Sequence, residues 1–185
     1  MRGFSRADRS LSLCGLNCLL CPMQLGGHCG GCGNGNQSCP VARCSLEHGS
    51  FEYCFQCPSF PCEKYDDADE HDSFITHRNQ LRDLEKAQAV GTAAYGEEQR
   101  RKRLLLDRLL SGYNDGRRKT LYCVAANLLD IGDIEVALRE CEASVGEASV
   151  GEAPIRERAT RMAHALKEIA ARRGIELKLR KKPRR

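Results

Sequence analysis

The chain has 185 residues, of which 12 are cysteine and none is tryptophan, and its formal net charge is +4. This length allows one domain, or a small domain and a modest one. Aromatic residues make up 5% of the chain and the mean hydropathy is -0.50, so we do not expect a single large hydrophobic core. The net charge is too small to indicate a partner by itself.

Residues 1–13 form a polar lead-in that carries positive charge but lacks an apolar run of signal-peptide length. No stretch of the sequence approaches the length of a membrane span. We therefore predict a cytoplasmic protein that does not associate with membranes. In a reducing cytoplasm, closely spaced cysteine pairs are more often metal ligands than disulfide partners.

Residues 14–62 are predicted to be a cysteine-rich metal-binding module. Large apolar residues are sparse in this range and glycines are frequent, which favours loops over a packed core. Three C-x2-C pairs occur here, and two sulfurs at this spacing can bind one ion when the backbone turns between them. The ten candidate ligands are Cys14, Cys18, Cys21, Cys29, Cys32, Cys39, Cys44, Cys54, Cys57 and Cys62.

Ten thiols divide most simply between two tetrahedral ions, which use four ligands each. Each structural zinc contributes on the order of 10–16 kcal/mol to folding, which the sparse apolar surface does not supply. Proximity along the chain groups one set as Cys29, Cys32, Cys39 and Cys44. A second set pairs two knuckles, Cys18 with Cys21 and Cys54 with Cys57, and leaves Cys14 and Cys62 unassigned.

The clearest single knuckle is the sequence CGGCG at residues 29–33. Gly33 is free to take the positive φ that such a turn requires, which points backbone amides at sulfur. His28 and His48 lie nearby as alternative ligands, but the surplus of cysteine favours exposed loop positions for both.

The spacing of the cysteines does not decide between zinc and an iron–sulfur cluster as the cofactor. Soft thiolate ligands suit zinc, and we favour two structural zinc ions. The C-x3-C-x2-C run at residues 14–21 matches the spacing that holds a 4Fe-4S cluster in radical-SAM enzymes, although nothing like their large barrel follows. Three Cys-Pro steps also resemble ferredoxins. An iron–sulfur cluster is therefore the alternative, and a disulfide framework the third option.

An acidic linker at 63–73 precedes a helical region at 74–141. Hydrophobic periodicity predicts helices over 74–90, 97–111, 117–129 and 130–141, and the third is apolar almost all round, as in a buried helix. Asn114-Asp115-Gly116 predicts a corner between helices. Cys123 and Cys141 are expected to be buried and inert.

The sequence ASVGE occurs twice in tandem, so 142–153 is predicted to be a low-complexity linker. Residues 154–185 follow as a C-terminal helix and basic tail, with an alternation at Ile175, Leu177 and Leu179 that predicts a short strand. The expected fold class is a small metal-stabilised, loop-rich cysteine module plus a mainly α-helical bundle of four or five helices.

Residues 154–185 contain 12 lysines and arginines against three glutamates. Arg117, Arg118 and Lys119 form another basic spot. Such surfaces contact nucleic-acid phosphates or an acidic protein, although interleaved aromatic residues for base stacking are absent from this tail. The competing interpretation is a solvated tail that also neutralises the thiolates.

Four motifs in order, CGLNCLLCP, CGGC, CPVARC and CFQCPSFPCEKY, resemble a prokaryotic cysteine-rich family catalogued as domain of unknown function 3795. Three later segments, THRNQLRDLEKAQAVG, YNDGRRKTLYCVAANLL and GIELKLRKK, resemble the helical extension of one branch of that family. The resemblance covers most of residues 14–182, and the ASVGE duplication departs from it as an insertion. It implies a prokaryotic source and confers no activity.

The sequence therefore predicts a cytoplasmic zinc-binding protein whose cysteine module is structural or an interaction surface. One alternative is an iron–sulfur protein for electron transfer or redox sensing, and another is a nucleic-acid-associated zinc protein that uses the basic tail. Phosphate-binding loops, nucleophile–base motifs and dinucleotide fingerprints are absent from the sequence, so no catalytic activity is predicted. A metal ion with an open coordination position would catalyse a reaction without any of these motifs.

Overall fold

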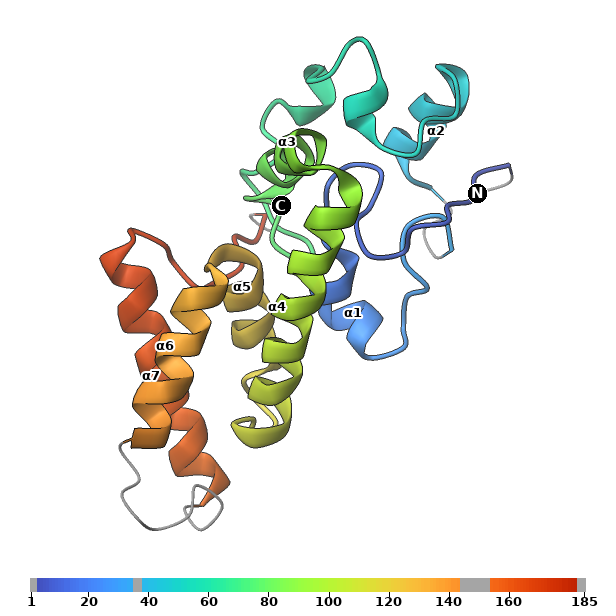
Figure 1. Ribbon diagram of the computed structural model, residues 1–185. Coiled ribbons are helices and arrows are strands. Elements are labelled where there is room, and N and C mark those ends of the chain that lie inside the picture. The colour runs from blue at the N-terminus through green and yellow to red at the C-terminus, as the bar shows by residue number, and fades with distance from the viewer. Residues whose placement is uncertain (1–2, 35–37, 144–153, 183–185) are drawn as a thin grey trace. The chain divides into compact units, whose positions relative to one another are not determined.

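The computed structural model describes residues 3–34, 38–143 and 154–182, which form seven α-helices and no strand (Figure 1). The mainly helical prediction is confirmed. The chain divides into two compact units: Met1–Arg100 together with Leu179–Arg185, and Arg101–Lys178. Within the described residues, no helix is long and apolar enough to cross a membrane.

The cysteines of the first unit lie on short helices and the turns between them. These elements are the 3-10 helices η1 (Cys18–Leu20), η2 (Cys54–Gln56) and η3 (Glu63–Tyr65) and the α-helices α1 (Pro22–Leu25) and α2 (Pro40–Glu47). Two Cys-Pro steps start α-helices, because proline at the first helical position has a fixed φ suited to the helix and needs no donor there. Cys21 and Cys39 are thereby placed as the N-cap residues of α1 and α2.

The first unit contains two small hydrophobic clusters that involve the N-terminal segment. One contains Leu11, Tyr53, Leu84, Ala87 and Tyr95, and the other contains Phe4, Leu13 and Ala42. The apolar residues of the N-terminal segment, Phe4, Leu11 and Leu13, therefore belong to the core of the module. The cysteine module accordingly has more apolar packing than its composition predicts.

The first two predicted long helices have different boundaries in the structure. Helix α3 spans Gln80–Val90 and α4 spans Thr92–Gly112, with Gly91 at φ +85° between them. The prediction of a helix from residue 74 is wrong. The Asp72 carboxylate accepts hydrogen bonds from Thr76 and His77, which hold residues 72–77 in a turn, and Phe74 is 65% exposed.

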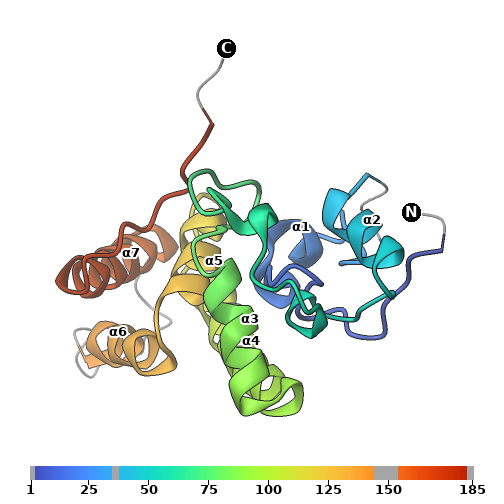
Figure 2. The same cartoon turned by 90° about the horizontal axis from the view of Figure 1, so that it is seen from above.

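The second unit contains the end of α4 with α5 (Lys119–Leu128), α6 (Ile131–Ala143) and α7 (Ile155–Arg172). Every residue of α5 from Tyr122 to Leu128 is buried, which confirms the prediction for this helix. Helix α6 packs along α7, as both views show (Figures 1 and 2). The predicted helix–helix corner is also confirmed, with Gly116 at φ +87° and the Asn114 side chain accepting hydrogen bonds from the Gly116 and Arg118 amides.

The predicted C-terminal strand is wrong, because residues 173–182 form no strand. Leu177 is buried while Glu176 and Lys178 are exposed. The alternation of apolar and charged residues in the sequence therefore corresponds to an alternation of buried and exposed side chains. A strand also needs a paired neighbour, and the only bridge among the described residues joins Leu11 and Asn17. The segment belongs to no sheet. The predicted linker at 142–153 lies almost wholly outside the described residues.

Candidate metal-binding cysteine module

All 12 cysteines lie in the described part of the chain, and none of them forms a disulfide. The ten of the predicted module are partly buried, whereas Cys123 and Cys141 are buried in the helices of the second unit. The prediction that the latter two are buried is confirmed. The ten module cysteines are partly shielded from water but remain accessible to a metal ion. This is the environment in which thiolates bind metal.

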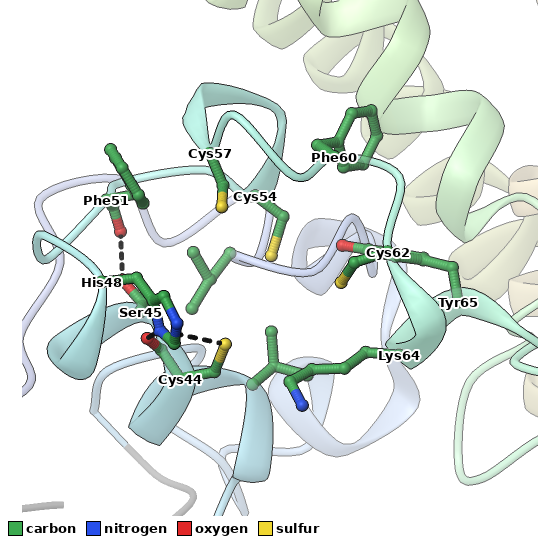
Figure 3. Close-up of a pocket in the computed structure, with 12 residues that line it drawn as sticks. Cys44, Ser45, His48, Phe51, Cys54, Cys57, Phe60, Cys62, Lys64 and Tyr65 are labelled. Carbon is green, nitrogen blue, oxygen red and sulfur yellow. Dashed lines mark hydrogen bonds between the residues drawn. The ribbon is translucent and has the colours of Figure 1, made fainter.

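Four module cysteines line one small cavity, of about 30 Å³. Figure 3 shows the sulfurs of Cys44, Cys54, Cys57 and Cys62 pointing toward its interior. The other residues of the wall are Leu13, Val41, Ser45, His48, Phe51, Phe60, Lys64 and Tyr65. A cavity of this size has room for an ion or one to two water molecules.

Short backbone hydrogen bonds place these four thiols. The Cys57 amide donates to the Cys54 carbonyl at 3.0 Å, which closes the η2 turn, and the Cys54 amide donates to the Leu13 carbonyl at 2.9 Å. The Tyr65 amide donates to the Cys62 carbonyl at 2.9 Å at the start of η3. Cys44 comes from α2. Three separate segments therefore bring thiols to one cavity.

A second group of thiols lies around Cys18. The Cys18 thiol accepts a hydrogen bond from the Cys32 backbone and lies near enough to Cys32, Cys21 and Cys14 for their charges to act on it. Burial, with those neighbouring thiols, raises the pKa of Cys18 to about 12. The first C-x2-C pair is closed by the Cys21 amide, which donates to the Cys18 carbonyl at 3.1 Å.

Cys14 lies within electrostatic reach of both groups. Its charge raises the pKa of Cys18 in one group and of Cys54 in the other. The Ser12 hydroxyl lies 3.3 Å from the Cys14 sulfur, and the Leu16 amide also hydrogen-bonds this sulfur. Burial outweighs these contacts and raises the pKa of Cys14.

Tyr65 connects the cavity to Cys14. Its hydroxyl donates to the Cys14 carbonyl at 3.4 Å and also hydrogen-bonds the Cys54 thiol. Burial raises the pKa of Cys54 to about 12 although the Tyr65 hydrogen bond opposes it. Burial together with the Cys54 hydrogen bond raises the pKa of Tyr65 as well. Both shifts favour the protonated forms of the two groups.

The knuckle at residues 29–33 has the geometry expected from its glycines. Gly33 has φ +85°, as predicted, and Gly31 has φ +88°. The Gly31 amide lies 3.4 Å from the Cys29 sulfur and donates to it. Amides aimed at sulfur stabilise the thiolate form, which is the form that binds a metal ion.

Arg6 was not anticipated from the sequence, yet it is the buried cation of the module. Its guanidinium donates to the Leu11 carbonyl at 2.7 Å, lies 3.2 Å from the Glu52 carboxylate and stacks 4.8 Å from the centre of the Tyr53 ring. Its backbone also packs against Gly33, where an added Cβ would come within 2.9 Å of the Arg6 nitrogen. An arginine in a polar N-terminal segment gives no sequence signal for this role.

The two histidines follow the prediction that they are exposed. His48 nevertheless belongs to the cavity wall, with its Nδ1 atom 2.8 Å from the Cys44 carbonyl oxygen and 3.7 Å from the Cys44 sulfur. His28 precedes the knuckle and is not part of that wall. His48 is thus placed beside the candidate ligands by one turn of α2.

The thiols lie in groups, but their positions do not form a complete metal coordination site. Within residues 3–34, 38–143 and 154–182, no three Cys, His, Asp or Glu side chains lie close enough together to hold one ion. The predicted first set is not assembled, because Cys44 lies with Cys54, Cys57 and Cys62 while Cys32 lies with Cys18. Grouping by nearness along the chain is therefore not the grouping in space.

No family model, curated protein or solved structure matches this chain. The resemblance to the cysteine-rich family stays a prediction.

Proposed function

We propose that residues 14–62 bind zinc through cysteine thiolates and that this module is structural or an interaction surface. The observation that carries the proposal is the convergence of Cys44, Cys54, Cys57 and Cys62 on one cavity of about 30 Å³. Soft thiolate donors are the ligands that zinc and iron–sulfur clusters select over hard cations. Four such donors at a cavity with room for an ion favour a tetrahedral zinc site.

The spatial groups give a different division of the ligands from nearness along the chain. We assign the four cavity cysteines to one ion and a second group to another ion, namely Cys14, Cys18, Cys21 and Cys32. Small side-chain rotations would have to bring each group to the Zn–S distance of about 2.3 Å. Cys29 and Cys39 are then left as spare thiols.

Metal analysis and a visible spectrum of anaerobically purified protein test the proposal. About two zinc ions per chain and a colourless solution are expected, because tetrahedral zinc has no visible transitions of its own. A brown protein that contains iron and acid-labile sulfide would instead establish the iron–sulfur alternative and overturn the zinc assignment.

Single-cysteine variants test the division of ligands. Cys57→Ser and Cys18→Ser should each lower the zinc content by about one ion, since each removes a ligand from a different group. Cys123→Ser is the matched control because Cys123 is buried in α5 and belongs to neither group. Equal loss of zinc in Cys123→Ser, or a loss of both ions in either single variant, contradicts the assignment.

A further inference from the structure

A hollow of about 470 Å³ lies on the second unit, at the start of α5. The residues around the first turn of α5 form it together with a distant part of the sequence, namely one residue of α7 and the segment that follows α7. Its walls are Arg117, Arg118, Leu121, Lys167, Ile175, Glu176, Leu177 and Lys178. The volume lies within the range of small-molecule sites.

The charges around this hollow are mostly positive. Arg117, Arg118, Lys167 and Lys178 contribute four cations, and Glu176 contributes the single carboxylate of the wall. Asp115 reduces the charge a little, since its carboxylate lies 3.7 Å from the Arg118 Nε atom. The excess of cations at one concave surface raises the local concentration of anions.

The backbone that carries the two arginines is fixed. The Asn114 carboxamide oxygen accepts hydrogen bonds from the Gly116 and Arg118 amides, each at 3.1 Å, and the Asp115 carboxylate accepts one from the Arg117 amide at 3.1 Å. An anchored turn of this kind fixes the backbone positions from which both arginine side chains extend before any ligand binds. The protein therefore loses less conformational entropy on binding.

The remainder of the wall is apolar. Leu177 is buried, and Leu121 and Ile175 are half-buried. Helix α5 begins beside these residues, and the side chain of its N-cap residue, Arg118, makes no capping hydrogen bond. The positive end of the helix dipole therefore adds to the field of the four side-chain cations. A ligand here meets cations on one side and aliphatic carbon on the other.

We infer that this basic hollow binds the phosphate groups of a nucleotide or of a nucleic-acid strand. Four cations around one concavity suit a ligand with several negative charges, and arginine forms paired hydrogen bonds with phosphate oxygens. The apolar wall gives a sugar or base a surface to contact. Both sources present the same phosphate chemistry, and the inference does not depend on metal binding by the cysteine module.

Binding measurements on the full chain at 0.15 M salt test this inference. Inorganic pyrophosphate is titrated by calorimetry, and a fluorescent single-stranded 12-nucleotide DNA is titrated by anisotropy. Arg117→Gln/Lys178→Gln should weaken binding at least tenfold. The matched control, Arg139→Gln/Arg156→Gln, removes two exposed positive charges from α6 and α7 outside the hollow and should change affinity less than threefold.

The two probes separate the sources of phosphate. Binding of pyrophosphate that the hollow variant weakens supports a small phosphorylated ligand, and selective weakening of DNA binding, with a smaller dependence on salt, supports a nucleic-acid strand. The inference is overturned if neither probe binds below 1 mM, or if the control variant loses as much affinity as the hollow variant. Circular dichroism of both variants confirms that they remain folded.

Discussion

Asp72 and Arg180 are joined by a reciprocal pair of hydrogen bonds although 108 residues separate them. The Asp72 amide donates to the Arg180 carbonyl at 2.7 Å, and the Arg180 amide donates to the Asp72 carboxylate at 2.8 Å. The same carboxylate accepts from the His77 amide at 2.7 Å and is completely buried. One side chain thus ties the C-terminal segment to the turn before α3.

Asp72→Ala should lower the free energy of unfolding by about 1–3 kcal/mol, because the substitution leaves the His77 amide without its acceptor and releases the Arg180 amide. Trypsin should also cleave after Arg180 faster, since the segment is no longer held. Chemical denaturation and mass spectrometry of the digest measure the two effects. Asp66→Ala, at an exposed neighbouring carboxylate, should change stability by less than about 0.5 kcal/mol. Equal effects in the two variants would contradict the role of Asp72.

Gly15 packs against the first turn of α3. A Cβ added at this position would lie 2.1 Å from the Gln80 carbonyl oxygen and 2.8 Å from the Leu84 side chain, and the residue has φ +92°. Gly15→Ala should therefore destabilise the first unit by on the order of 3 kcal/mol or more, because a backbone atom cannot move aside cheaply.

Gly27→Ala is the control for backbone strain alone. Gly27 has φ +71° but open space around its Cα, so alanine should cost only about 1–2 kcal/mol there. Urea unfolding curves of the two variants give the comparison. Similar losses would show that close packing on α3 contributes nothing beyond the positive φ.

Local signals in the sequence predicted the helices of the second unit well. The apolar residues of α5 recur on all sides, and a helix with this pattern has to be buried whatever its neighbours are. The corner at Asn114–Gly116 was also predictable, because its hydrogen bonds join residues at most four positions apart. In these cases the interactions that determine the conformation join residues only a few positions apart.

Contacts between distant residues explain the failures. The turn before α3 depends on a carboxylate shared with Arg180, so periodicity alone placed the helix start too early. The Cys54 amide donates to the Leu13 carbonyl across 41 positions of sequence, and both residues line the cavity. The prediction grouped Cys44 with Cys39 because the two are close in sequence. A local sequence pattern does not reveal a contact between residues 41 positions apart.

Asp8 should make stability depend on acidic pH. Burial raises the pKa of its carboxyl, but hydrogen bonds from Ser10 and Tyr53 and the charge of Arg6 outweigh burial, so the pKa lies below its ordinary value. The Tyr53 hydroxyl donates to this carboxylate at 2.5 Å. The stabilisation is therefore complete above the unfolded-state pKa of about 3.9 and is lost as pH falls through the lower folded-state value.

The test compares the wild-type chain with Asp8→Asn, which does not titrate. The difference in free energy of unfolding should be largest at pH 5–6 and should shrink below pH 4. Protonation of other groups, including the thiols, affects both proteins alike and cancels in the difference. A difference that stays constant from pH 6 to pH 3 would show that the carboxylate is not preferentially stabilised in the folded state.

Metal removal should affect the two units differently if the cysteine module binds zinc as proposed. A structural zinc contributes on the order of 10–16 kcal/mol to folding, so an anaerobic chelator with a phosphine reductant should unfold the module. Helices α5, α6 and α7 should remain folded, because their buried residues, such as Tyr122, Leu138 and Leu166, form a core without candidate ligands.

Hydrogen exchange followed by mass spectrometry resolves this difference. After chelation, amides of residues 14–62 should exchange within seconds, while amides in the centres of α5 and α7 should keep their protection. Cys123→Ser should give the same pattern as the wild-type chain, since its thiol is not among the proposed ligands. Unchanged protection of the module after complete zinc removal would show that hydrophobic packing around Leu11, Leu13 and Tyr53 is sufficient to fold it.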